Sequence, residues 1–128
     1  IYSEAKHSVY VIDNYISLKT LVLMKSVAAG VAIILFSDNL MNGLHSTEYA
    51  DFQKEYPSIN VKLLRIKGRF HDRYIILDYN TDSEKIYHCG ASSKDEGSRV
   101  TTISEVTERE VYHDLIDEIL KYPTLKLK

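Results

Sequence analysis

Short runs of β-branched and aromatic residues alternate with segments of helical periodicity through the first half of the chain. The runs cover residues 8–13, 31–36 and 61–66, and polar or turn-forming residues follow each of them. Between the runs, apolar residues recur at helical spacing over residues 17–29 and 46–56. Strands that alternate with helices in this way predict parallel strands joined by crossover helices.

The second half of the chain predicts antiparallel pairing. Residues 73–77 and 85–89 are expected to be strands joined by the polar loop 80–83, which is typical of a hairpin. A final amphipathic helix is expected over residues 107–121, with acidic side chains on its outer face. The chain therefore predicts an α/β fold in the order β-α-β-α-β-β-β-α, with a mixed β-sheet flanked by helices.

The composition is that of a soluble globular protein with one core. The chain has 128 residues, of which 45% are hydrophobic and 27% charged, and its net charge is −2. No apolar run approaches the ~20 residues that a membrane-spanning helix needs. Because the chain begins at Ile1 without an initiator Met or a secretory leader, we expect residues 1–128 to be a single cytoplasmic domain taken from a longer chain.

The cysteine and histidine pattern argues against a metal site. Cys89 is the only cysteine, which excludes a disulfide within the chain, and its apolar surroundings favour a buried position. The five histidines are scattered and show no close ligand spacing. We therefore expect no metal and no other cofactor.

Charge is unevenly distributed along the chain. Residues 62–73 contain five basic side chains and one acid, whereas residues 105–118 contain six acids and one arginine. A local positive patch attracts anions even on a slightly acidic domain. The basic segment could therefore guide a phosphate backbone.

Polar residues follow two of the expected parallel strands. Asp13 and Asn14 follow the first, and Ser37, Asp38 and Asn39 follow the second. Ligands of α/β sheets gather at the carboxyl ends of parallel strands, so both clusters are candidate binding groups. Asp, Asn and Ser also suit turns and helix caps, which is the commoner reason for finding them there.

The segment from residue 70 to residue 78 carries the most informative chemistry. His71 and Arg73 are two residues apart, so on a strand they project from the same face. A neutral imidazole can attack phosphorus, and a guanidinium can hold two phosphoryl oxygens. Asp78 falls on the opposite face of a regular strand, which favours a structural role for it.

A second candidate segment follows the next expected strand. Residues 90–97 combine small residues with two hydroxyls, Ser92 and Ser93, and with Lys94. Such a turn can bind an anion through backbone N–H groups that point inward. An ordinary loop is the simpler interpretation of the same residues.

Together these two segments resemble the phospholipase D-like superfamily. That family carries the motif H-x-K-x4-D on a strand, followed about a dozen residues later by a turn of the Gly-Ser type. The corresponding residues here are His71, Arg73 and Asp78, followed by Gly90-Ala91-Ser92-Ser93. The resemblance extends over most of the chain, implies the phospholipase D-like sandwich as the fold, and is greatest to the short, single-motif branch that includes nucleases.

The resemblance implies a metal-independent phosphodiesterase that acts on a phosphodiester, with DNA as the candidate substrate. By this analogy His71 is the nucleophile that forms a phosphohistidine, and Arg73 replaces the usual Lys in holding the phosphoryl oxygens. Ser92 and Ser93 would contact the phosphate. The implied supporting residues are Asp13, Asn14, Asp78 and Lys94. Because the chain has one motif and the family site needs two, the resemblance implies a homodimer in which the second His71 is the general acid.

The arginine in place of lysine leaves an alternative open. Arg and Lys differ in geometry and reach, so the exchange can preserve phosphate binding while impairing turnover. The alternative is a catalytically degenerate module that binds phosphate or nucleic acid, or dimerises, for a partner DNA-binding domain N-terminal to residues 1–128. The carboxylate that would orient His71 also stays open between Asp13, Glu105 and Glu108.

Overall fold

The computed structural model describes residues 1–91 and 102–128 and contains a mixed α/β fold. The strands are β1 (Ser8–Ile12), β2 (Ala32–Phe36), β3 (Val61–Leu64), β4 (Asp72–Leu77), β5 (Lys85–Ala91) and β6 (Ser104–Glu105). The α-helices are α1 (Leu18–Leu23), α2 (Ser46–Glu55) and α3 (Glu110–Ile119). Short 3-10 turns cover Tyr2–Glu4, Met24–Ser26 and Leu40–Asn42. The expectation of an α/β fold with a mixed sheet is confirmed.

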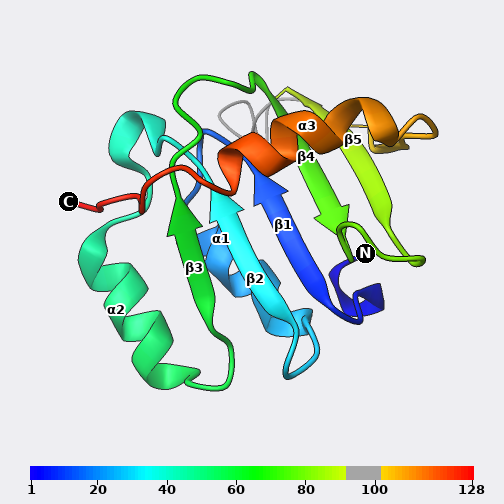
Figure 1. Ribbon diagram of the computed structural model, residues 1–128. Coiled ribbons are helices and arrows are strands. Elements are labelled where there is room, and N and C mark those ends of the chain that lie inside the picture. The colour runs from blue at the N-terminus through cyan, green and yellow to red at the C-terminus, as the bar shows by residue number, and fades with distance from the viewer. Residues whose placement is uncertain (92–101) are drawn as a thin grey trace.

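The described strands form one sheet in the order β3-β2-β1-β4-β5-β6. β1, β2 and β3 run parallel to one another, and β4 pairs antiparallel with both β1 and β5. The carboxyl ends of β1, β2, β3 and β5 therefore meet the start of β4 at one edge of the sheet, at the top in Figure 1. We call this edge, with the turns that follow those strands, the carboxyl edge.

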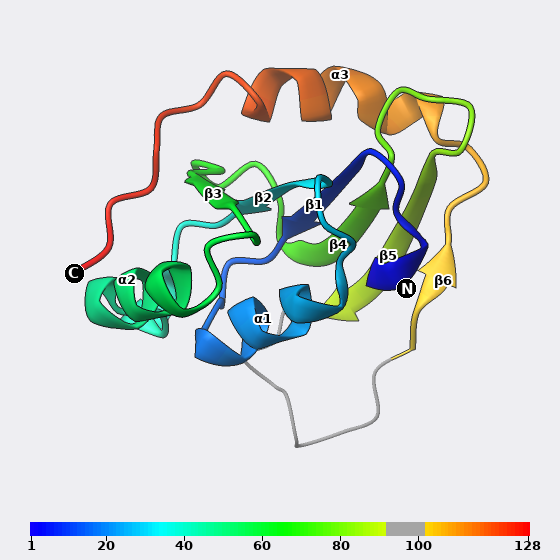
Figure 2. The same cartoon turned by 90° about the horizontal axis from the view of Figure 1, so that it is seen from below.

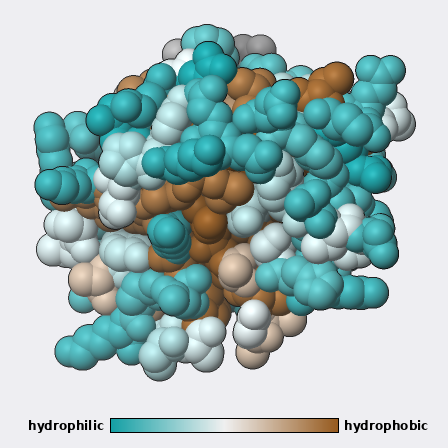
Figure 3. Space-filling model, viewed as in Figure 1, coloured by the Kyte–Doolittle hydropathy of each residue, from teal (hydrophilic) through white to brown (hydrophobic). Residues whose placement is uncertain are grey.

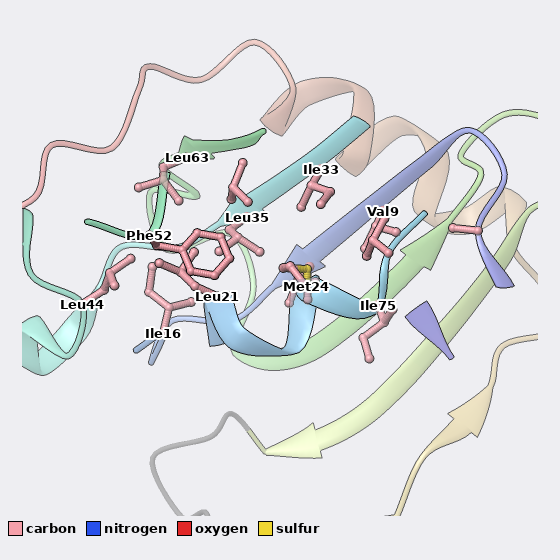
Figure 4. Packing of buried hydrophobic residues seen from close by; sticks show 14 of the residues in the cluster. Val9, Ile16, Leu21, Met24, Ile33, Leu35, Leu44, Phe52, Leu63 and Ile75 are labelled. Carbon is pink, nitrogen blue, oxygen red and sulfur yellow. The ribbon is translucent and has the colours of Figure 1, made fainter. Parts of the chain in front are cut away.

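The sheet separates two layers of helices. Figure 2 shows α3 on one face, with α1 and α2 on the other. In Figure 4 the side chains of Val9, Leu35 and Ile75 on the sheet point toward Leu21 of α1 and Phe52 of α2. These side chains belong to one buried apolar cluster. A second buried apolar cluster lies between the sheet and α3 and contains Phe36, Ile76, Ile86, Ile116 and Ile119. Burial of these two apolar faces is the main stabilising contribution to the fold.

α3 leaves part of its face of the sheet uncovered. Figure 3 shows apolar residues at the surface below the helix. A hollow of about 350 Å³ in the sheet is lined by Val31, Ala32 and Ile34 on one side and by Ser58 and Asn60 on the other. α3 thus covers the half of the sheet nearer the carboxyl edge.

Several expected element boundaries were wrong. The helix expected over residues 17–29 ends at Leu23 and tightens into a 3-10 turn, in which the Val27 N–H bonds to Met24. Its buried side chains are Leu21, Met24 and Val27, whereas Leu18 and Val22, which share the helical apolar spacing, are exposed. The final helix spans ten residues rather than fifteen. β6 was not expected, because a strand that pairs over two residues is too short to leave a periodic signal in the sequence. It adds a fourth consecutive strand before the final helix.

The segment after α3 extends the sheet beside β3. Leu64 pairs with Thr124 in an antiparallel bridge, and the N–H of Arg65 donates to the carbonyl of Pro123. The N–H of Leu125 donates to Leu63. The edge of β3 is thereby covered, which reduces the risk of pairing with another chain.

Candidate active site at the carboxyl edge

The turn after β2 organises the segment that leads to β4. Both carboxylate oxygens of Asp38 accept backbone N–H groups, from Ile66, Lys67 and Gly68, at 2.9–3.2 Å. Lys67 and Gly68 have φ values of +52° and +74°, so the chain makes a left-handed turn there. The Asp38 carboxylate satisfies the N–H groups that this turn exposes. Asp38 is therefore a structural residue of the carboxyl edge.

Asn14 joins the ends of three strands. Its side-chain amide donates to the carbonyl of Phe70 at 3.0 Å, and its side-chain oxygen accepts the N–H of Asp38 at 3.2 Å. Its own carbonyl accepts the N–H of Leu40. Asn14 thus fixes the residue before His71 relative to β1 and β2, which is a supporting role.

Arg73 lies at the end of a small hollow beneath the sheet. The hollow has a volume of about 40 Å³, and its polar lining comes from Tyr2, Asp13, Lys19 and Thr20 beside Arg73. Arg73 is half-buried, and its Nε atom is buried without a hydrogen-bond partner in the described part of the chain. An unpaired guanidinium N–H is costly to bury, so an anion that reached this atom would supply the acceptor that it lacks.

The charge of Arg73 acts on its neighbours. Burial raises the pKa of the Tyr2 hydroxyl to about 12, and the Arg73 charge opposes that rise. Burial also raises the pKa of the Cys89 thiol, again opposed by Arg73, which hydrogen-bonds to it. Cys89 is fully buried, so it is a core residue with a polar contact rather than an exposed nucleophile.

Asp13 places a negative charge beside this arginine. It is 2% exposed, lines the same hollow, and accepts the N–H of Tyr15 at 2.9 Å. Lys19 and Thr20 also line the hollow, and sequence reasoning missed both of them because they lie on α1, far from the motif. Their only sequence signal is their position just after the first strand.

His71 is exposed and lies immediately before β4. It is not among the residues that line the Arg73 hollow. Within the described residues, no hydrogen bond joins the His71 ring to a carboxylate, and Glu105 and Glu108 are exposed. The structure therefore brings His71 and Arg73 to the same edge of the sheet but places only Arg73 inside the hollow.

Asp78 lies at the opposite end of β4 from His71. Its carboxylate accepts the N–H groups of Lys6, His7 and Ser8 at 2.6–3.2 Å and the hydroxyl of Ser83 at 2.9 Å. Desolvation raises the pKa of Asp78, but the combined lowering by these hydrogen bonds is larger than that rise. The pKa of Asp78 is therefore below its usual value. Asp78 anchors the start of β1 to the hairpin and takes no part in the carboxyl edge.

A β-bulge lies where β5 reaches this edge. Asp72 pairs with Ala91 and Tyr74 with His88, so β5 has one more residue than β4 between these pairs. Gly90 falls in the extra stretch with a φ of +70°, which favours glycine. The bulge ends the pairing at the candidate site. The predicted phosphate-binding residues Ser92 and Ser93 and the predicted supporting residue Lys94 lie outside the described residues.

The other face of β4 carries a pair that sequence reasoning missed. His88 Nε2 and Asp72 Oδ2 are 2.9 Å apart, and the His88 ring packs 5.0 Å from that of Tyr74. Adjacent residues of a strand point to opposite faces, so His88 lies on the α3 side and Cys89 on the α1 side. The pair therefore lies on the opposite face of the sheet from Arg73.

The basic segment 62–73 does not form one patch. Arg69 is paired with Glu118 at 2.7 Å, and the Lys67 ammonium lies 5.4 Å from the centre of the Tyr122 ring. Lys62 lies in the hollow below α3. The basic side chains of this segment are therefore distributed over different parts of the surface, and a role of the segment in guiding a phosphate backbone stays a prediction.

Comparison with known proteins found no match, either to a protein-family model or to a curated protein. None of the helices in residues 1–91 and 102–128 has the length and apolar character needed to cross a membrane.

Proposed function

We propose that the protein is a metal-independent phosphodiesterase, with nuclease activity as its most plausible form, and that its reaction takes place at the carboxyl edge. The observation that carries the proposal is the Arg73 guanidinium, whose buried Nε lacks a partner among the described residues, at the edge where the exposed His71 immediately precedes the same strand. A cation that binds phosphoryl oxygens and a histidine that attacks phosphorus are the two groups such chemistry needs.

In the proposed reaction a ring nitrogen of His71 attacks phosphorus, and the bond from phosphorus to the leaving alcohol oxygen breaks. That oxygen receives a proton from His71 of the partner subunit. Water then attacks the phosphohistidine and gives its proton back to the partner's His71. The P–N bond breaks and His71 is restored. Arg73 balances the negative charge of the phosphoryl oxygens through both steps.

A group of exposed apolar side chains supports a composite site made by two copies. Leu18, Leu40 and Met41 are large apolar side chains that are exposed, and Met41 is 82% exposed. All three lie in the turns at the carboxyl edge, since Leu40 bonds to Asn14 and Leu18 begins α1. Exposed apolar residues beside a candidate site are typical of a protein interface. A second copy there would bring its own His71 to the same phosphate.

The test is hydrolysis of bis(p-nitrophenyl) phosphate and of single-stranded DNA in excess EDTA. We expect activity that survives chelation and is lost in His71→Ala. His7→Ala is the matched control, because His7 is also exposed but lies at the start of β1, at the opposite edge of the sheet. Wild-type protein without activity, or His71→Ala with full activity, would contradict the proposal.

The second candidate function is a non-catalytic module that binds phosphate or nucleic acid. It is favoured by the position of His71 outside the hollow that Arg73 lines. In that case Arg73→Ala abolishes the binding of inorganic phosphate, measured by calorimetry. His71→Ala binds phosphate as the wild type does, and neither of the two proteins hydrolyses the phosphodiester. The two candidates are therefore separated by the same pair of variants.

A further inference from the structure

A groove opens at the carboxyl edge beyond the candidate active site. It has a volume of about 400 Å³ and lies between the turn after β2 and residues 123–128. Arg65 at the end of β3 and Lys126 and Lys128 on the C-terminal segment all line it. All three side chains are on exposed residues, so their charges face solvent or a ligand. We call this surface the basic groove.

The one acid in the lining does not cancel these charges. Asp38 already accepts three backbone N–H groups of the following turn, and the Arg65 Nε lies 3.7 Å from its carboxylate. Three cations, Arg65, Lys126 and Lys128, against one carboxylate leave the lining with a net positive charge. The neutral lining includes Asn42, whose φ is +49° and which presents an amide at the wall. The groove is therefore a positive and hydrogen-bonding surface.

Direct hydrogen bonds connect the basic groove to the residue before His71. Asn39 lines the groove, and the N–H of the next residue, Leu40, donates to Asn14. Asn14 in turn donates to Phe70, which precedes His71. The groove lies at the ends of β2 and β3, and β4 is three strand spacings from β3. At ~4.8 Å per spacing, β4 is roughly 10 Å from β2 and roughly 14 Å from β3.

One phosphate cannot occupy both places at that separation, whereas a strand of linked phosphates can. We infer that the basic groove binds the backbone of a single nucleic-acid strand away from the phosphodiester at His71. The inference rests on the proposed function and adds to it a second contact surface for the polynucleotide substrate, separate from His71. The cations supply contacts that do not depend on sequence, and each displaces counterions from the strand.

The experiment measures binding of a fluorescent single-stranded oligonucleotide by anisotropy, in the His71→Ala background so that turnover does not interfere. The groove variant carries Arg65→Ala, Lys126→Ala and Lys128→Ala. The control variant carries Lys6→Ala, Lys54→Ala and Lys85→Ala, which remove the same charge from residues that do not line the groove. Circular dichroism and thermal melting verify that both variants fold.

We expect the groove variant to bind about tenfold more weakly than the control variant, with a salt dependence shallower by about 2 in the log–log slope. Equal weakening in both variants, or no binding by the parent protein, would overturn the inference. So would a groove variant that loses binding to phosphatidylserine vesicles but not to DNA.

Hydrolysis of bis(p-nitrophenyl) phosphate separates this inference from the proposed function. In the wild-type background, the groove substitutions should leave that hydrolysis unchanged and reduce DNA cleavage. Loss of both reactions in the groove variant would contradict a separate binding surface. If the wild-type protein hydrolyses the small ester but binds DNA no better than the groove variant does, the proposed function stands and the inference about the groove is wrong.

Discussion

Arg73, near the start of β4, and Asp78, just after its end, have different roles. Arg73 keeps one buried nitrogen without a partner among the described residues, which leaves it free for an anion. The Asp78 carboxylate, by contrast, accepts five hydrogen bonds, from the N–H groups of Lys6, His7 and Ser8 at the start of β1 and from the hydroxyl of Ser83. A single motif thus supplies one candidate catalytic group and one structural anchor.

Asp78→Asn should destabilise the fold by about 1–3 kcal/mol at pH 7, because the amide cannot accept all of the N–H groups that the carboxylate accepts. Asn tolerates the left-handed backbone at this position, where φ is +53°, so the change isolates the carboxylate. Urea unfolding of the wild type and the variant gives the difference.

The pKa of Asp78 also fixes how this difference depends on pH. The folded pKa lies below the unfolded one, so the contribution is complete above the ordinary carboxyl pKa of about 4 and is lost as pH falls through the folded pKa. The gap between wild type and Asp78→Asn should therefore narrow in acid. A gap that stays constant down to about pH 2 would contradict this account.

At the scale of elements, one buried carboxylate fastens α3 to the hairpin between β4 and β5. Glu84 lies in that hairpin with a side chain only 3% exposed. It accepts hydrogen bonds from Arg109 Nε at 3.1 Å and His113 Nε2 at 2.8 Å, and the N–H of Asn80 donates to its other oxygen. The helix is thus held by charge as well as by its apolar face.

Glu84→Gln should loosen α3 and lower stability by about 1–3 kcal/mol, because it leaves the Arg109 guanidinium and the His113 ring without the carboxylate that accepts their hydrogen bonds. Amide hydrogen exchange should accelerate more in α3 than in β1. Glu108→Gln is the control, since that residue is exposed and precedes the helix. An effect no larger than that of the control would show that apolar packing alone holds α3.

For the whole molecule, periodicity predicted the α/β class, the parallel first half and the antiparallel second half of the sheet. Periodicity did not predict the elements whose ends or existence depend on tertiary contacts. The helix after β1 ends at Leu23, and β6 forms only by pairing with β5. Motif spacing identified Arg73, but Lys19 and Lys126 could not be found, because only the folded chain brings α1 and the C-terminal segment to the carboxyl edge.

The composite site also predicts a property of the whole molecule, namely that it is a homodimer in solution. Sedimentation equilibrium should give twice the mass of one chain, and Leu18→Glu should dissociate the dimer. Val111→Glu is the matched control, because both residues are exposed in the first turn of a helix, where an acidic side chain is tolerated. A monomeric wild-type protein that hydrolyses phosphodiesters would contradict the paired site.

The most direct test of phosphodiester chemistry at the carboxyl edge is to trap the intermediate. Wild-type protein is mixed with a phosphodiester substrate and quenched in alkali, in which phosphohistidine is stable, and its peptides are analysed by mass spectrometry. The account predicts a phosphoryl adduct on His71 that is absent from His71→Ala. Substrate consumed without any adduct on His71, or an adduct on a different residue, would contradict it.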